Sequence, residues 1–140
     1  MILLDTNVIS ELMRTEPAQI VLNWFGKHDA CDLFISAVTE AELRTGVAIL
    51  PEGQRRDRLQ LAIDAMIDQD FQGRVLPFDS LAAKAYATIA AQRRVAGRPI
   101  AEADCQIAAI ARATDAPIAT RNVKDFDGCD VRLINPWNDQ

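Results

Sequence analysis

Acidic side chains at the starts of several expected helices are the residues of this 140-residue chain that could do chemistry. Asp5 directly follows the apolar run Met1–Leu4, at the point where a buried strand would end. In an open parallel sheet, ligands bind in the crevice beyond the carboxyl ends of the strands, so Asp5 is a candidate metal or catalytic ligand. An Asp or Thr here could also cap the next helix by accepting free backbone N–H groups, and the two roles are compatible.

Asp104 is the acid that ordinary packing explains least well. On a helix it would share a face with small or apolar residues, namely Ile100, Ile107, Ala108 and Ala111. Glu102 lies off that face. Because an ionised carboxylate on an apolar face is costly unless it is paired or bound to a cation, Asp104 is a second candidate ligand. The alternative is a buried salt bridge to Arg98 or Arg121.

Glu42 lies near the start of a third expected helix, just past a strand. It shares one side of that helix with Val38, Thr45 and Ile49. The alternative is specific: Thr39 and Glu42 match the S/T-x-x-E spacing of a capping box, in which the Glu reaches back to the N-terminal backbone N–H.

A fourth acidic place follows the apolar run Ile118–Thr120, where Asn122, Asp125 and Asp127 compete for one role. Any of them could instead be a turn or cap residue, which is the commonest use of Asn and Asp after a strand. If the four acidic places meet, the carboxylates repel one another and some must take up protons. Bound Mg²⁺ or Mn²⁺, which prefer oxygen ligands and keep several waters, would remove that conflict.

The elements needed to bring these acids together can be read from the apolar runs. Strands are predicted at Ile2–Leu4, Leu33–Ser36, Val75–Leu76, Ile118–Thr120 and Val131–Ile134. Helices are predicted over 7–13, 17–28, 37–50, 54–71, 79–96 and 101–115, with Pro17 at a first helical position, Asp79 and Ser80 at an N-cap and Gly97 at a helix end. This alternation predicts an α/β fold: an α/β/α sandwich with a mainly parallel sheet of about five strands, covered by helices.

The composition is that of a soluble globular protein, with 49% hydrophobic and 25% charged residues and a mean hydropathy of −0.02. No run is long enough for a membrane span, and the N-terminus lacks the basic region of a secretion signal, so we expect a cytoplasmic protein. Cys31, Cys105 and Cys129 form no CxxC pair, which favours reduced thiols over a disulfide framework or a zinc site.

The formal charge of −5 and the pI of about 4.8 argue at first sight against nucleic acid as a partner. Acids gathered to hold divalent cations, however, lower the net charge while creating a place that attracts phosphate once metal is bound. His28 is the chain's single histidine and is remote from the acidic motifs, which excludes RNA cleavage by a histidine pair. No cysteine has a nearby base, which disfavours a thiol nucleophile.

The same residues resemble the PIN-domain ribonucleases, and within them the VapC/FitB-like toxins of bacterial toxin–antitoxin pairs. The resemblance spans nearly the whole chain and rests on four motifs: LLDTN at 3–7, SAVTEAELRTG at 36–46, ADCQIAA at 103–109 and ATRN at 119–122. The closing Asn135-Pro136-Trp137 is similar to the FitB branch.

The resemblance implies a single domain over residues 1–140 that hydrolyses RNA phosphodiesters with Mg²⁺, for which Mn²⁺ can substitute. The family's acids fall on Asp5, Glu42 and Asp104, with Asp5 and Asp104 as metal ligands. At the fourth place, which is acidic in many members, this chain has Asn122, and Asp125 is the candidate replacement. Residues expected to support the acids are Thr6, Thr120 and Asn122, and those expected to contact phosphate are Arg44, Arg98 and Arg121.

The resemblance also implies a partner, a small cognate antitoxin whose C-terminal segment crosses the acidic groove with a basic side chain among the carboxylates. By analogy we expect a homodimer or a hetero-oligomer with the antitoxin, with the helical region 54–71 at the dimer surface. The alternative is a PIN-like module that has lost catalysis and only partners a regulator, which Asn122 favours. A nucleotide-binding or phosphatase-like domain is disfavoured because the chain has neither a GxxxxGK[ST] nor a GxGxxG loop.

Overall fold

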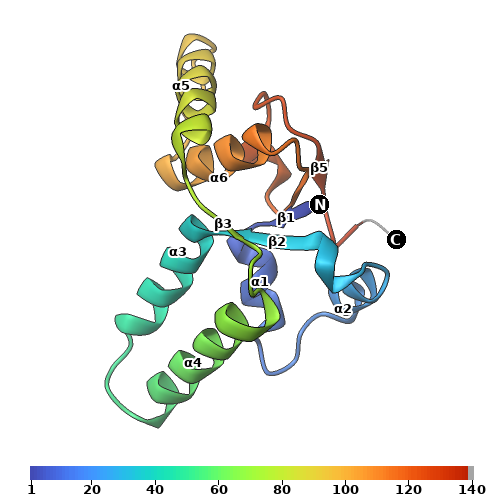
Figure 1. The fold of residues 1–140 in the computed structure, drawn as a ribbon, viewed down its shortest axis with the longest axis vertical. Coiled ribbons are helices and arrows are strands. Elements are labelled where there is room, and N and C mark those ends of the chain that lie inside the picture. Colours follow the sequence, from blue (N-terminus) through green and yellow to red (C-terminus); the bar gives the residue numbers. More distant parts are fainter. Residues whose placement is uncertain (139–140) are drawn as a thin grey trace.

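A five-stranded, fully parallel sheet forms the centre of the computed structural model, which describes residues 1–138 (Figure 1). The strands are β1 (Ile2–Leu4), β2 (Leu33–Ser36), β3 (Val75–Leu76), β4 (Ile118–Ala119) and β5 (Leu133–Ile134). Their order is β3-β2-β1-β4-β5, and Leu3 of β1 lies opposite Phe34 on one side and Ile118 on the other. All five predicted strands are confirmed, although β4 and β5 are shorter than predicted. The last two residues of the predicted domain, 139 and 140, lie outside the described residues.

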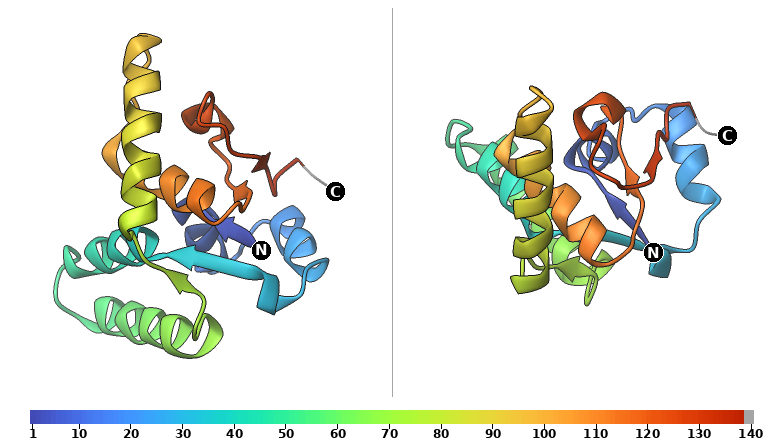
Figure 2. Two further views of the ribbon diagram at one scale, coloured as in Figure 1. Left: turned by 45° about the horizontal axis from the view of Figure 1, so that its top comes forward. Right: turned by 90° about the horizontal axis from the view of Figure 1, so that it is seen from above.

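Six α-helices connect and cover the strands (Figures 1 and 2). They are α1 (Thr6–Leu12), α2 (Gln19–Gly26), α3 (Ala37–Ala48), α4 (Gln54–Ala65), α5 (Ser80–Val95) and α6 (Glu102–Ala113). Shorter helical turns lie at η1 (Ala30–Asp32), η2 (Met66–Asp70, π-helical) and η3 (Val123–Phe126). The predicted helix 54–71 is therefore α4, which continues without a break into the π-helical turn η2 and ends at Asp70.

Two helix starts test the capping residues predicted from the sequence. Asp79 is the N-cap of α5, as predicted, since its side chain accepts a hydrogen bond from Ala82 N at 3.0 Å. The prediction that Pro17 opens a helix is wrong, because α2 begins at Gln19. Ala18 stays extended before it, and its N–H donates to the Glu11 carboxylate at 2.9 Å.

The sheet separates two hydrophobic cores, which makes the fold an α/β/α sandwich. Leu3 and Ile118 face one core, which α5 and α6 cover through residues such as Ile89 and Ile107, Ile110 and Ala111. Leu4 and Ala119 face the other core, which α1 to α4 cover through residues such as Val8, Trp24, Leu43 and Ile63. Adjacent residues of one strand thus enter opposite cores, as the alternation of side chains along a strand requires.

The chain changes direction across the sheet between β1 and β4. From β1 it adds β2 and then β3 on one side, and it later returns to add β4 and β5 on the other. A hydrogen bond joins the two strands of this reversal where they end. Asp5, which directly follows β1, donates its N–H to the carbonyl oxygen of Ala119, the last residue of β4, at 2.9 Å. In open α/β sheets the crevice for ligands forms beyond the carboxyl ends of the strands at such a reversal. Asp5 and Thr120 both lie there.

Candidate active site

A pocket of about 510 Å³ lies beyond the carboxyl ends of β1 and β4. Three of the predicted acids line it: Asp5 from the end of β1, Glu42 from α3 and Asp104 from the first turn of α6. The other lining residues are Thr6, Asn7, Ser10, Glu11, Arg14, Arg121, Asn122 and Trp137. The structure thus brings together acids that are up to about a hundred residues apart in the sequence.

Asp5 is the most deeply placed of these acids, with 6% of its surface exposed. Its Oδ1 accepts from Thr6 N at 2.8 Å, so it is also the N-cap of α1, and both roles considered for it coexist. Its Oδ2 accepts from the buried Thr120 Oγ1 at 2.8 Å and from Asn7 Nδ2 at 3.1 Å. Burial nevertheless raises the pKa of Asp5, with a further contribution from the charge of Glu42.

Glu42 is held at the pocket by Thr6. The Thr6 hydroxyl donates to Glu42 Oε1 at 2.6 Å and lies 3.0 Å from the Thr39 hydroxyl. The capping-box alternative is wrong, because α3 begins at Ala37 and its N-cap is Ser36, whose Oγ accepts from Thr39 N at 3.0 Å. Glu42 is therefore free of a capping role and lies in the second turn of the helix.

Asp104 lies half-buried in the first turn of α6, with Ile107, Ala108 and Ala111 buried along its helix. Burial, followed by the charges of Asp5, Asp125 and Glu42, raises the pKa of Asp104 to about 6. The alternative of a buried salt bridge is wrong: within residues 1–138, Asp104 makes no ion pair. Asp104 therefore faces other carboxylates without an ion-pair partner, and the positive charge of Arg93 offsets their effect on its pKa only in part.

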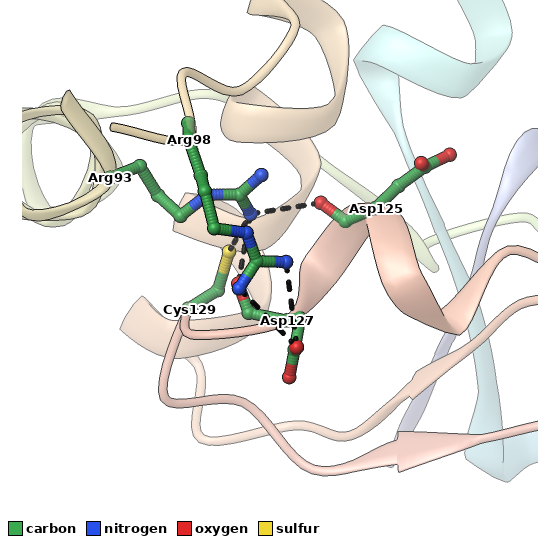
Figure 3. Close-up of polar contacts among 5 residues, drawn as sticks. All are labelled: Arg93, Arg98, Asp125, Asp127 and Cys129. Carbon is green, nitrogen blue, oxygen red and sulfur yellow. Dashed lines mark hydrogen bonds and ion pairs between the residues drawn. The ribbon is translucent and has the colours of Figure 1, made fainter. Parts of the chain in front are cut away.

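The fourth acidic place is divided among three residues with different surroundings. Asn122 lines the pocket, and its N–H donates to Thr120 Oγ1 at 3.0 Å. The negative charge of Asp125 raises the pKa of both Asp5 and Asp104, so its carboxylate acts on the pocket. Asp127 instead lies against Arg98, at 3.4 Å, and Figure 3 shows its carboxylate pointing away from that of Asp125. The charges thus favour Asp125 over Asp127.

Of the three arginines predicted to contact phosphate, only Arg121 lines the pocket, with its guanidinium 5.0 Å from the centre of the Trp137 ring. Arg44 is held between Glu40 and Asp64, at 2.7 and 2.8 Å. Arg98 is exposed and pairs with Asp127. The structure therefore separates Arg44 and Arg98 from the acids, and it adds Arg14, which the sequence reasoning missed.

Two further residues of the pocket were also missed. Asn7 joins both strand ends: its Nδ2 donates to Asp5 and Thr120, and its Oδ1 accepts from Arg121 N at 3.1 Å. Its place directly after the Asp5-Thr6 pair was the available signal. Glu11 is a buried acid and the single charged residue of α1, and the hydrogen bond from Ala18 N, together with nearby Arg14, holds its pKa below its ordinary value. Its signal was the single charge among the uncharged residues of the predicted first helix.

The pocket suits a divalent cation by its chemistry. Asp5 and Asp104 are carboxylates whose pKa values are raised by burial and by the charges of neighbouring acids, and a bound cation would favour their ionised forms. In residues 1–138, no group of three or more Asp, Glu, His or Cys side chains is placed to hold a metal ion by itself. Mg²⁺ does not require one, because it is usually held by one or two carboxylates and keeps several waters.

The histidine and the three cysteines lie outside the acidic pocket. His28 follows the end of α2 and packs on Trp24, with ring centres 4.4 Å apart. The three cysteines are unpaired, as predicted, and burial raises the pKa of both Cys105 and Cys129. Neither residue type contributes to the acidic pocket. In the part of the chain that is described, no helix is long and apolar enough to cross a membrane.

Comparisons with known proteins agree with this geometry. The model of the PIN domain family matches residues 2–129. The chain is 44% identical to VapC ribonuclease Y4jK of Sinorhizobium fredii over 98% of both chains, and 43% identical to Toxin FitB of Neisseria gonorrhoeae over 99% of this chain and all of that one. It also superposes with a TM-score of 0.93 and 41% identity on a chain in a solved structure of FitAB bound to an IR36 DNA fragment, covering 100% of this chain and 98% of that one.

Proposed function

Because this chain belongs to the PIN domain family, we propose that it is a metal-dependent endoribonuclease and the toxin of a toxin–antitoxin pair. The observation that carries the proposal is the pocket at the sheet reversal, which brings the carboxylates of Asp5, Glu42 and Asp104 together, while neither Asp5 nor Asp104 forms an ion pair among the described residues. Such a site is unfavourable when it holds no cation and is stabilised when it holds one. The names of the relatives, a VapC ribonuclease and Toxin FitB, support RNA as the substrate and toxin as the role.

Asp5 and Asp104 would hold the cation, Mg²⁺ or Mn²⁺. When bound, it would supply a more acidic water and offset the charge on the phosphate oxygens. Thr120 and Thr6 N keep the Asp5 carboxylate in place through hydrogen bonds of 2.8 Å each. Asn122 supports this arrangement through its N–H on Thr120.

Glu42 and Asp125 would complete the acidic site and accept a proton from the attacking water. The Thr6 hydroxyl, which donates to Glu42 at 2.6 Å, orients that carboxylate. Arg121 would contact a phosphate of the RNA from the pocket wall, whereas Arg44 and Arg98 would do so only from outside it. The expected products carry a 5′-phosphate and a 3′-hydroxyl.

The experiment is cleavage of a structured RNA by the purified chain with Mg²⁺ or Mn²⁺, with mapping of the product ends. We expect cleavage to stop in excess EDTA and in Asp104→Asn. Glu102→Gln, on the same helix but outside the pocket, is the matched control and should cleave normally. Full activity in EDTA or in Asp104→Asn would contradict the metal mechanism.

The proposed partner is a small antitoxin. A second groove, of about 860 Å³, shares Thr6, Ser10, Arg14 and Glu42 with the acidic pocket and continues over an apolar floor that includes Leu43, Val47 and Ile63. It could accept a partner segment that ends at the acids with a basic side chain, which the formal charge of −5 would attract. Co-purification with the product of a neighbouring gene tests this; a chain that is always recovered alone would count against it.

The alternative function is a PIN-like module that binds a regulator without catalysis, and Asn122 favours it because it supplies no charge at a place lined by acids. Calorimetric titration with Mn²⁺ separates the two functions. The nuclease should bind the ion in the micromolar range, and Asp5→Asn should abolish that binding. An inactive module should show no such site in the wild-type chain.

A further inference from the structure

Arg93 is an unusual residue for the end of a surface helix, since only 7% of its surface is exposed. Arginine is rarely buried unless it is paired. Within residues 1–138, however, Arg93 forms no ion pair with a carboxylate. Its partners are instead backbone carbonyl groups and one thiol, which come from two separate loops (Figure 3).

The first loop is the one that ends α5. Gly97 adopts a left-handed φ of +72°, and Gly97 N and Arg98 N donate to Arg94 O and Arg93 O at 3.0 and 2.9 Å. This is the Schellman arrangement that closes many helices. The Arg93 side chain adds a third bond, from Nε to Arg98 O at 2.6 Å, so the position of the guanidinium is fixed by the helix end itself.

The second loop is the segment 122–129, which follows β4 and includes η3. Arg93 Nη1 donates to Asp125 O at 3.0 Å and to Asp127 O at 2.9 Å, and it lies 3.7 Å from Cys129 Sγ. Gly128 has a φ of +78°, and a Cβ placed on it would lie 3.8 Å from Arg93 Cδ. One guanidinium nitrogen thus holds the backbone on both sides of Phe126.

This segment also carries Asp125. Figure 3 shows the Asp125 carboxylate directed away from Arg93, while its carbonyl group points toward Arg93. The side chain is exposed and, among the described residues, makes no hydrogen bond or ion pair that would orient it. Its direction therefore depends on the backbone of the turn, which Arg93 holds.

We propose that Arg93 is a positioning residue that fixes the segment 122–129 against the end of α5 and thereby directs the Asp125 carboxylate toward the acidic pocket. The proposal deepens the proposed function, on which the role of Asp125 rests. Arginine suits this task because its planar fork reaches carbonyl groups of two loops at once, whereas a lysine ammonium is a single point donor.

The test is Arg93→Lys, which keeps the charge but loses the fork. Arg94→Lys is the matched control, because Arg94 is the next residue of the same helix and is exposed. The first readout is amide hydrogen exchange at Asp125 N and Cys129 N, which donate within the segment to Asn122 O and Phe126 O. We expect their protection to fall about tenfold in Arg93→Lys, while protection of Asp5 N is unchanged and Arg94→Lys has no effect.

The second readout is kcat, measured in a double-mutant cycle with Asp125→Asn. Loss of a residue that orients metal-site groups typically lowers activity about ten- to a hundredfold. We expect kcat to fall by a factor of this size in Arg93→Lys. In the Asp125→Asn background, Arg93→Lys should change kcat less than about twofold, because the group it positions is already gone. A merely structural role would lower activity by the same factor in both backgrounds.

The outcomes separate this proposal from the proposed function. Unchanged amide exchange in Arg93→Lys overturns the positioning role, whether or not the chain cleaves RNA. An equal loss of kcat in both backgrounds overturns the action through Asp125. If the wild-type chain is not a nuclease, the exchange data still decide whether Arg93 holds the segment. If Arg93→Lys does not fold, Gly128→Ala, which strains the same turn from the loop side, should give the same exchange pattern.

Discussion

Replacing Asp104 with Asn should stabilise the metal-free protein while removing its activity. The pKa of Asp104 rises from its ordinary 3.8 to about 6, chiefly through burial and then through the charges of Asp5, Asp125 and Glu42. Since a pKa change of one corresponds to about 1.4 kcal/mol, ionised Asp104 costs the metal-free fold at most about 3 kcal/mol at pH 7. Solvent screening at a half-buried site reduces this, so we expect a gain of about 1 to 3 kcal/mol in Asp104→Asn.

The sign of the pH dependence follows from the same pKa. Because the folded-state pKa of Asp104 lies above the unfolded-state value, the folded chain binds this proton more tightly. The penalty is therefore nearly full above about pH 6, falls to roughly half at pH 5 and to about a fifth at pH 4, and is lost below the unfolded-state pKa. The advantage of Asp104→Asn over the wild type should shrink in step as the pH is lowered.

Urea unfolding in EDTA at pH 7 and pH 5 measures this difference, with Glu102→Gln as the exposed control on the same helix. Asp104→Asn removes no hydrogen bond or ion pair within the described residues, so little stability is lost to offset the gain. Addition of Mn²⁺ should reverse the order, because an ion at about 1,000 times its Kd stabilises the wild type by about 4.1 kcal/mol and the variant hardly at all. A variant that is less stable than the wild type in EDTA at pH 7 would refute the reasoning.

Three further outcomes are expected. Thr120→Val removes the buried 2.8 Å hydrogen bond to Asp5. Urea unfolding should show that the free energy of unfolding falls by about 1 to 3 kcal/mol, and calorimetry should show a weaker affinity for Mn²⁺. An unchanged affinity for Mn²⁺ would show that Asp5 does not need this hydrogen bond. Glu42→Gln should keep the melting temperature, since an amide oxygen can also accept from Thr6, but lose at least tenfold in kcat; an active variant would remove Glu42 from the mechanism. Leu61→Glu, at a 68%-exposed side chain in the region predicted to dimerise, should shift the mass measured by light scattering toward the monomer, and an unshifted mass would place the dimer surface elsewhere.

The sequence was most informative where local pattern and topology agree. Short apolar runs predicted all five strands, and the parallel sheet they imply places their carboxyl ends at one edge. Asp5 and Asp104 could be selected because one follows a strand and the other interrupts an apolar helix face. Both signals lie within a few residues of the acid itself.

The rest depends on contacts between distant residues or on angles that spacing leaves open. Both Ser36 and Thr39 match the pattern of an N-cap, and only the observed start of α3 shows that Ser36 has that role. Arg44 could not be placed from the sequence because one of its partners, Asp64, is 20 residues away. Asp125 and Asp127 are only two residues apart in a tight turn, yet their carboxylates have different neighbours. Asp127 pairs with Arg98, whereas the charge of Asp125 acts on Asp104.

The hydrogen bond from Thr120 to Asp5 joins residues that are 115 positions apart, and Asp104 enters the pocket from the last helix of the fold. While the chain is being synthesised, its first hundred residues hold Asp5 and Glu42 but neither Asp104 nor β4. Ribosome-bound intermediates and truncated fragments therefore have no assembled site. The acidic pocket can therefore assemble only after α6 and β4 have been synthesised.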